Sequence, residues 1–447
     1  MIKKIALVSL GCARNLVDSE LILGTLKKSG YKIAGSPSGS DVTVVNTCAF
    51  IEDAKKESID EILELIELKE KKKLKYLLVV GCLSQRYAGV LKKEFPEIDG
   101  FAGVDAVQVL PGMIKKLARG GRPDIIINEP RYLHDDKSPR LGLTPVHYSY
   151  VKVSEGCSHK CSFCIIPRIR GRHRSRNPAS IIREAKDLVA RGAKELDIIG
   201  QDTTLYGRDL PGKHNLAGLL RDLSRQSGAK WIRLLYTHPA HFTDELISVI
   251  AGEKNICKYI DLPIQHINDG ILRRMGRGST GAGIRRLISH IRSSIPGVAL
   301  RTSVIVGFPG ESRKNFRELL DFIKEVKFER LGAFVYSAEE GTAASRFDGS
   351  VPADEKAERW DMIMGTQRDV SAGINAALVG RQMSVLIDEK VSGEDDLFTG
   401  RSYMDAPEID GNVFVKGHNI RRGDMVEVEI ADGYEYDLVG KEIKRRR

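Results

Sequence analysis

The sequence lacks the long apolar run that a membrane-spanning helix needs, since no stretch of about 18 apolar residues occurs in it. The apolar stretch near the start ends at Gly11 and is too short for the core of a signal peptide. Internal repeats are absent, and the one low-complexity tract is the basic run 444–447, which we expect to be a solvated, mobile end. These absences predict a cytoplasmic protein that does not bind a membrane.

Cysteine is also sparse, with 7 cysteines in 447 residues. An odd number in a large chain argues against a disulfide framework and favours metal ligation or catalysis. The chain is too long for one hydrophobic core, so its length predicts two to four domains. With 42% hydrophobic and 29% charged residues, the composition is that of an ordinary globular protein.

The first hundred residues alternate between short apolar runs and amphipathic segments. Runs rich in Val, Ile and Leu predict buried strands, and apolar residues at helical spacing predict helices between them. The predicted strands are 5–10, 42–45 and 76–80, and the predicted helices are 16–29 and 53–74. This alternation predicts an α/β domain with an open parallel sheet at residues 1–117.

A polar segment with Gly and Pro at 118–142 predicts a linker, after which a second series of strands and helices occupies residues 143–375. The predicted strands there are 147–153, 195–199, 231–236, 258–262, 299–306 and 332–336. Six such units are fewer than the eight of a closed barrel. We therefore expect an open, partial (β/α)6 barrel.

The pattern changes again at residues 376–447, where short alternating strands are separated by Gly-rich turns. The predicted strands are 383–387, 398–403, 413–415, 425–430 and 434–439, which favours a small five-stranded β-barrel. Residues 378–440 carry 6 basic and 14 acidic side chains, a net charge of −8, although the whole chain carries +10. An acidic barrel would attract a basic protein and repel a phosphate backbone, or its charge could simply keep the domain in solution.

Three cysteines lie within eight residues directly after the first predicted barrel strand: Cys157, Cys161 and Cys164. Three thiolates at this spacing can each bind one iron of a cubane cluster, which leaves the fourth iron without a protein ligand. Such an open position is typical of a reactive metal site. A structural zinc site is the alternative, with His159 or His173 as the fourth ligand.

A second set comprises Cys12, Cys48 and Cys82, each just past the end of a predicted strand in the N-terminal domain. Ligands of open parallel sheets bind beyond the carboxyl ends of the strands, so three strands can bring three thiolates to one edge. The alternative is three ordinary buried cysteines. Cys257 has no partner in the sequence, and we interpret it as a packing residue.

The spacing of Cys157, Cys161 and Cys164, with Phe163 before the last, resembles the signature of the radical SAM superfamily. The resemblance implies a 4Fe–4S cluster whose open iron binds S-adenosylmethionine (SAM), and reductive cleavage of SAM to a 5′-deoxyadenosyl radical. It also implies that Phe163 packs by the adenine. Further SAM contacts are expected at the ends of successive strands, at Gly200, Gln201, Asp202, Gln265, Arg301, Ser303, Val306 and Gly307. At 200–202 the superfamily usually has a Gly-Gly-Glu type turn.

The three parts together resemble the radical SAM methylthiotransferase family, which joins a three-cysteine domain, a radical SAM domain and a TRAM domain. The resemblance implies two 4Fe–4S clusters and two SAM per product. One SAM methylates sulfur held at the N-terminal cluster, and the other supplies the radical. A methylthio group then replaces hydrogen on an unactivated carbon.

Two branches of that family differ in substrate. Segments 9–20, 166–176, 261–266 and 436–440 are similar to the branch that modifies the β-carbon of an aspartate in the twelfth small-subunit ribosomal protein. The alternative branch modifies an adenosine of transfer RNA. The resemblance implies two partners: that ribosomal protein, free or in its subunit, and a low-potential electron donor such as flavodoxin or ferredoxin.

Five arginines alternate through 168–176, at Arg168, Arg170, Arg172, Arg174 and Arg176. Such a run fits a solvated loop, a nucleic-acid contact or a role near SAM, and it does not choose between the two substrates. A non-catalytic iron–sulfur or zinc protein that binds RNA would not need two sets of three cysteines.

Overall fold

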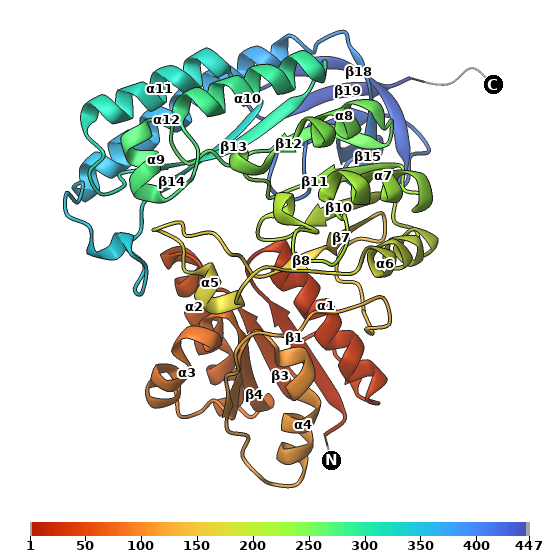
Figure 1. Cartoon of the computed structure of the whole chain (residues 1–447). Helices are drawn as coiled ribbons and strands as arrows, with labels where there is room; N and C mark the ends of the chain where they lie inside the picture. Colours follow the sequence, from red (N-terminus) through yellow and green to blue (C-terminus); the bar gives the residue numbers. More distant parts are fainter. Residues whose placement is uncertain (1, 444–447) are drawn as a thin grey trace.

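The computed structural model describes residues 2–443, and these form three parts that follow one another along the chain (Figure 1). An α/β domain lies at the bottom of the view, an open barrel lies above it, and a small β-barrel packs at the upper right. Within residues 2–443 no helix is long and apolar enough to cross a membrane. The mobile end expected at 444–447 lies outside the described residues.

The N-terminal domain is a parallel sheet of six strands in the order β2-β1-β3-β4-β5-β6, as the alternation predicted. Apolar residues of α1 and α4 pack on one face of the sheet, and those of α2 and α3 pack on the other. The strands are β1 Lys4–Ser9, β2 Lys32–Ile33, β3 Ser40–Thr47, β4 Leu74–Gly81, β5 Gly100–Ala102 and β6 Ile125–Ile126. The helices are α1 Ala13–Lys28, α2 Glu52–Glu70, α3 Cys82–Glu94 and α4 Ala106–Ala118.

Two boundaries differ from the prediction. The segment 118–142 is not only a linker, because β6 lies within it and pairs with β5 at the edge of the sheet. Two residues are too few to produce a detectable pattern. The helix predicted at 53–74 ends at Glu70, since Leu74, whose apolar side chain continued the helical spacing, begins β4.

The central part is an open sheet of six parallel strands in the order β14-β13-β12-β11-β10-β7, which confirms the partial barrel. Its strands are β7 Tyr148–Lys152, β10 Glu195–Ile199, β11 Trp231–Leu234, β12 Ile256–Asp261, β13 Ala299–Val306 and β14 Arg330–Val335. Its longer helices are α6 Pro178–Ala190, α7 Leu216–Gln226, α8 Asp244–Gly252, α9 Asp269–Met275, α10 Gly281–Ser294 and α11 Arg313–Val326. A short ladder of β8 Ser154–Glu155 and β9 Arg174–Ser175 brackets the cysteine loop and helix α5 Ile166–Arg170.

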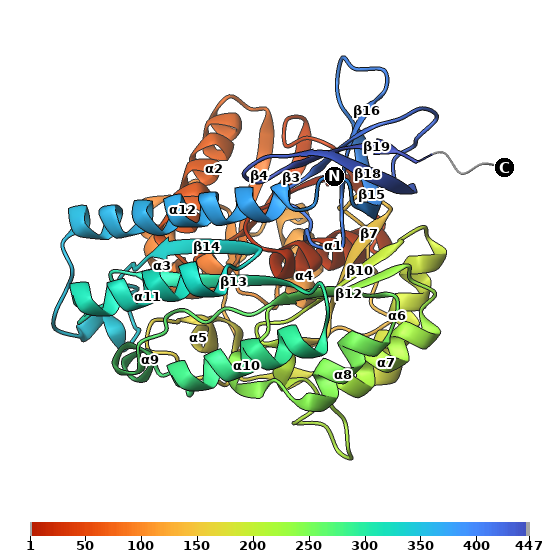
Figure 2. The ribbon, with the colours of Figure 1, turned by 90° about the horizontal axis from the view of Figure 1, so that it is seen from above.

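Helix α12, Ala353–Ala376, leads from the central part to the C-terminal barrel and lies along β14 (Figure 2). That barrel is closed, with five strands in the order β15-β16-β17-β19-β18. The strands are β15 Gln382–Lys390, β16 Leu397–Arg401, β17 Val413–Lys416, β18 Met425–Gly433 and β19 Leu438–Glu442. The last strand was predicted too early, at 434–439, because residues 434–437 alternate like a strand but form the turn before β19.

The C-terminal barrel is attached to the central part by buried ion pairs. Glu195 of β10 accepts from Arg233 Nε at 2.7 Å and from Arg401 Nη1 at 2.5 Å, and none of these three side chains is more than 3% exposed. Asp405 and Asp410 of the C-terminal barrel pair in the same way with arginines of β14 and β13. Asp405 and Asp410 are thus used to hold the domains together and do not contribute to the acidic surface that the sequence predicted for the C-terminal barrel.

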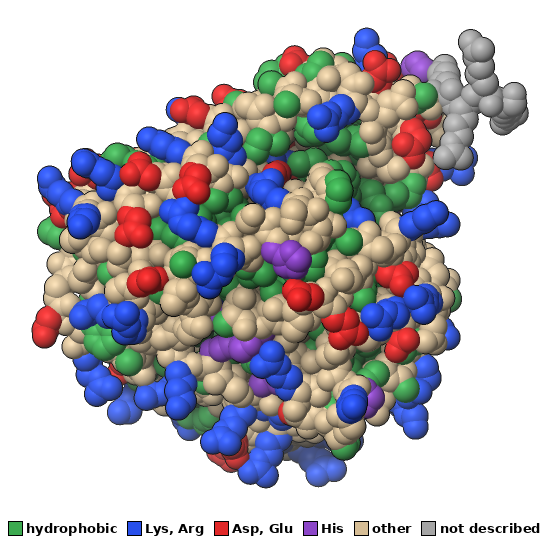
Figure 3. All heavy atoms as spheres, turned by 45° about the horizontal axis from the view of Figure 1, so that its top comes forward, with side chains coloured by type: hydrophobic (Ala, Val, Ile, Leu, Met, Phe, Trp, Pro, Cys, Tyr) green, Lys and Arg blue, Asp and Glu red, His purple; other side chains and the backbone are tan. Residues whose placement is uncertain are grey.

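Basic side chains are conspicuous on one face of the molecule. On the face drawn in Figure 3, Lys and Arg side chains gather along the lower edge, with fewer acidic ones between them. This agrees with the net charge of +10.

We predict that Glu195→Gln lowers the free energy of unfolding by about 3–5 kcal/mol, because two buried guanidinium groups then lose a charged partner. Urea denaturation followed by circular dichroism measures the change. Glu325→Gln is the control, since its ion pair with Arg285 is exposed and should leave the denaturation midpoint where it was. Equal midpoints for Glu195→Gln and the parent chain would contradict the ion-pair interpretation.

Candidate functional site

The cysteines of the N-terminal set follow β1, β3 and β4, which are neighbours in the sheet. In the strand order of this sheet the chain reverses its winding direction between β1 and β3, so Cys12 and Cys48 lie on either side of that point. Such a point is the usual ligand position in open parallel sheets. Two glycines keep this edge open. A side chain at Gly11 would meet Cys48 Sγ at 2.9 Å, and one at Gly81 would meet Asn46 Oδ1 at 2.4 Å; both have φ above +80°.

Two arginines lie beside these thiols. Burial opposes ionisation of Cys12, but Arg14 and Arg170 outweigh it and lower the pKa of its thiol. Burial raises the pKa of Cys48 to about 11 and also raises that of Cys82, which accepts a hydrogen bond from Arg170 Nη2 at 3.4 Å. The helix α1 begins directly after Cys12, and α3 begins at Cys82. Guanidinium groups and helix N-termini both favour thiolates, the form that binds iron.

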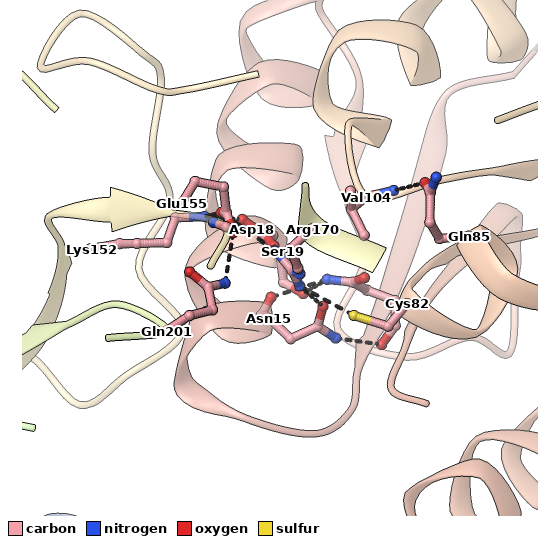
Figure 4. Close-up of polar contacts among 12 residues, drawn as sticks. Asn15, Asp18, Ser19, Cys82, Gln85, Val104, Lys152, Glu155, Arg170 and Gln201 are labelled. Atoms are coloured by element: carbon pink, nitrogen blue, oxygen red, sulfur yellow. Dashed lines mark hydrogen bonds and ion pairs between the residues drawn. The ribbon is translucent and has the colours of Figure 1, made fainter. Parts of the chain in front are cut away.

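A buried ionic network connects this edge to the central barrel (Figure 4). Arg170, at the end of α5, donates to Asp18 of α1 at 2.5 Å, and Lys152 of β7 donates to the same carboxylate. Lys152 also pairs with Glu155 at 2.7 Å, and Glu155 accepts from Gln201 Nε2 at 2.7 Å. The network therefore runs from the N-terminal cysteines to the strand ends of the central barrel.

The second cysteine loop, 157–164, is held at both of its ends. The backbone N–H of Cys157 donates to Gly171, and Ser162 between the later cysteines donates its N–H to Met275 and its hydroxyl to Arg274. Burial raises the pKa of Cys157 to about 11 and that of Cys164 to about 12. Metal binding would have to displace these protons, as it does in thiolate sites generally.

A cavity of about 360 Å³ opens in front of this loop, between the N-terminal domain and the central barrel. All three cysteines of the loop line it, and the predicted residues Phe163, Gln201, Asp202, Gln265 and Ser303 join them. Arg14, Phe50 and Ile51 line it from the N-terminal domain. The structure thus brings most of the predicted SAM residues to one space.

The remaining predicted residues lie elsewhere. Arg301 is near the start of β13 and pairs with Asp261 at 2.9 Å and Asp410 at 3.3 Å, so it faces the C-terminal barrel and not the cavity. It was predicted with Ser303 because both lie on one strand, but of the two only Ser303 lines the cavity. Val306 and Gly307 are buried and do not line the cavity, and neither does Gly200, whose carbonyl accepts from Arg14 at 2.9 Å.

Two of the five arginines at 168–176 are buried structural residues, and so is Cys257. Arg170 and Arg176 are buried, and Arg176 pairs with Glu184 at 2.6 Å. Arg168 and Arg172 are exposed. Cys257 is 3% exposed and packs in β12, as the sequence interpretation stated.

One cluster was missed by the sequence analysis as a site. His159, Asp202, His238 and His241 bring one ligand atom each to within 4.8 Å of one another. His159 Nε2 lies 2.5 Å from Asp202 Oδ2, and the His159 and His238 rings stack at 4.3 Å. The cluster could bind a divalent cation or hydrogen-bond the hydroxyl groups of a ligand. The strand-end rule that selected Asp202 applies equally to His238, four residues past the end of β11.

Three family models match the chain. The uncharacterised protein family UPF0004 matches residues 4–103, the Radical SAM superfamily matches 151–323, and the TRAM domain matches 379–443. Among solved structures, the radical SAM methyltransferase TsrM from Kitasatospora setae gives a TM-score of 0.54 at 16% identity, covering 74% of this chain and 72% of that chain. The cobalamin-dependent SAM radical enzyme OxsB gives 0.55 at 14% identity, covering 81% and 56%. At this identity the likeness concerns the fold alone.

Curated relatives are much more similar. The proteins named ribosomal protein uS12 methylthiotransferase RimO share 47% identity over 438 residues in Clostridioides difficile, covering 98% of both chains. The same name applies in Pelotomaculum thermopropionicum, at 46% over 441 residues and 98% and 99% coverage, and in Geobacter sulfurreducens, at 45% over 441 residues and 98% of both. With the radical SAM domain and the two cysteine sets described above, this similarity shows that the chain belongs to the RimO family of radical SAM methylthiotransferases.

Proposed function

We propose that this chain methylthiolates the β-carbon of an aspartate in ribosomal protein uS12, in the cytoplasm, and consumes two SAM per product. The names of relatives that are 43–47% identical over nearly the whole chain support the choice of uS12. The observation that carries the proposal is that one set of three cysteines lines the cavity, while Arg14, which also lines it, lies beside a cysteine of the other set. An enzyme that only cleaves SAM would need one set.

The donor atoms of the loop fit a SAM-binding cluster. A radical SAM domain implies one 4Fe–4S cluster and SAM. Cys157, Cys161 and Cys164 would hold that cluster and leave one iron open, since the loop provides three thiols at the cavity wall and its one histidine there, His159, already pairs with Asp202. Of the predicted SAM contacts, we retain Phe163, Gln201, Asp202, Gln265 and Ser303.

The N-terminal set fits a second 4Fe–4S cluster. Cys12, Cys48 and Cys82 offer three thiols at one sheet edge, and Arg14 and Arg170 would offset the negative charge of a thiolate-bound cluster. When bound, the two clusters and SAM would supply the radical and methylthio chemistry, with electrons from a low-potential donor such as flavodoxin or ferredoxin. The chain itself would orient the substrate and exclude water.

Apolar side chains line the cavity and would help to exclude water from it. Phe50 of the N-terminal domain and Phe334 and Val335 of β14 line it, yet each is at least 40% exposed in the free protein. A substrate loop that covered them would bury apolar surface and close the site. Exposed carboxylates of the C-terminal barrel, among them Glu389 and Glu429, would raise the encounter rate with a basic ribosomal protein.

The function is tested by anaerobic reaction of the reconstituted enzyme with SAM, reductant and either uS12 or transfer RNA. We expect uS12 to gain one methylthio group in place of hydrogen, at an aspartate that tandem mass spectrometry identifies. Omission of SAM is the control. Methylthiolation of a transfer RNA adenosine with unmodified uS12 would overturn the substrate assignment and leave the reaction type intact.

We predict two clusters, and therefore about eight irons in the reconstituted chain. Replacing Cys157, Cys161 and Cys164 by Ala should halve the iron and abolish SAM cleavage. Replacing Cys12, Cys48 and Cys82 should also halve the iron but leave cleavage to 5′-deoxyadenosine measurable. Iron analysis and product chromatography provide the measurements.

Cys257→Ala is the matched control for the loss of a thiol, since Cys257 is buried away from both sets and should not change the iron content. Stoichiometric zinc without iron–sulfur absorbance in the native protein would refute the two-cluster prediction.

We predict that Phe163→Ala weakens SAM binding by about 1–3 kcal/mol, because Phe163 lines the cavity. Equilibrium binding to the cluster-loaded protein measures the loss. Phe347→Ala is the matched control: both rings pack on the same apolar cluster around Met275 and Phe308, but Phe347 does not line the cavity. Equal SAM affinities of the two variants would show that Phe163 is only a core residue.

A further inference from the structure

Arg14 extends from the N-terminal domain into the cavity between the two cysteine sets. It is the second residue of α1, two positions after Cys12. Its Nη1 donates to the carbonyl of Gly200 at 2.9 Å, and its guanidinium group lies 4.4 Å from the centre of the Tyr236 ring. Arg14 therefore contacts the ends of two strands of the central barrel while it stays next to the N-terminal thiols.

No carboxylate lies within 4.0 Å of the Arg14 guanidinium among residues 2–443, and this distinguishes it from the arginines of the domain interfaces. Arg170, Arg233 and Arg401 are all buried and each pairs with Asp or Glu at 2.7 Å or less. The acid beside Arg14 is the Cys12 thiol, which the proposed cluster would engage, so no carboxylate of the described residues offsets the desolvation of this guanidinium group. Its free donors, directed into a ligand cavity, favour an anionic ligand.

The support beneath Arg14 is rigid. Tyr236 has φ of +57°, which is rare for a bulky residue. The backbone N–H of Tyr236 donates to Asp261 Oδ2 at 2.8 Å, which helps to hold this conformation. A strained residue held by its surroundings is typical of a functional site. The aromatic ring and the Gly200 carbonyl together fix the plane of the guanidinium group, as bidentate recognition of a carboxylate requires.

We propose that Arg14 binds the side-chain carboxylate of the substrate aspartate, and that it selects a carboxylate over a nucleobase. This inference rests on the proposed function. In an aspartate the carboxyl carbon is bonded directly to the β-carbon. Holding the carboxylate at Arg14 would therefore fix the β-carbon between the two cysteine sets, within reach of the groups that each would hold.

The test is a comparison of two enzymes with two substrates. Binding of uS12 to the cluster-loaded enzyme with SAM is measured for uS12 itself and for uS12 in which the modified aspartate is replaced by asparagine. We expect the parent enzyme to prefer the aspartate form by about 10- to 100-fold, the usual value of a charge-assisted pair. Arg14→Met should remove this preference, and Arg14→Lys should restore part of it.

Arg277→Met is the matched control. Arg277 lines the same cavity, and it too lacks a carboxylate within 4.0 Å among the described residues, but it lies beside Cys161 and donates to Pro263. This variant should keep the preference for aspartate. Iron content reports on the integrity of each variant, and Arg14→Gln replaces Arg14→Met if the latter loses iron.

The two proposals fail in different ways. If the parent enzyme neither binds nor modifies uS12, the proposed function is wrong. If the parent enzyme modifies uS12 but Arg14→Met still prefers the aspartate form, only the role of Arg14 is wrong. The same conclusion follows if Arg14→Met weakens the binding of SAM instead, or if Arg277→Met also loses the preference for aspartate.

Discussion

The pairing of Asp18 with Lys152 and Arg170 is the interaction on which the geometry of the site depends. The carboxylate belongs to the N-terminal domain, and both cations belong to the central part. The side chains are at most 10% exposed, so separation of the domains would leave charges without partners in a poorly solvated region. The ion pairs therefore fix the position of the strand ends of the N-terminal sheet relative to the strand ends of the central barrel. Because both cysteine sets lie at these strand ends, the separation between them is fixed as well.

Arg170 of this network, together with Arg14, determines the electrostatics of the N-terminal thiols. Arg170 binds Asp18 with one nitrogen and donates to Cys82 with the other. Arg14 lowers the pKa of Cys12 and partly offsets the effect of burial on Cys48. Positive charge is thus concentrated where three anionic ligands would have to lie close together. Hydrogen bonds and charge of this kind also tune the reduction potential of iron–sulfur clusters.

The sequence predicted the sheets and both cysteine sets because each depends on a local pattern. Continuous apolar runs identify β3, β4 and β13, and the rule that ligands lie past strand ends identifies Cys12, Cys48 and Cys82. The errors concern features that only tertiary structure decides. β6 is two residues long and depends on β5 for its existence, and the docking of the C-terminal barrel on β13 determines which way Arg301 faces. Arg14 gave no signal, since a basic residue in the first turn of a helix is unremarkable until its environment is known.

The polar groups that remain without partners are informative because several lie at the same cavity. Among the described residues, Gln201 Oε1, His238 Nε2 and the Tyr336 hydroxyl are buried without a hydrogen-bond partner, and all three residues line it. Buried polar groups in folded proteins are nearly always paired, so such a concentration marks a place where a ligand provides the partners. SAM, with its amine, carboxylate and ribose hydroxyls, offers both donors and acceptors to groups near Cys157. Arg14 lines the same cavity from the N-terminal domain, where a protein substrate with a carboxylate side chain would supply it with an anion.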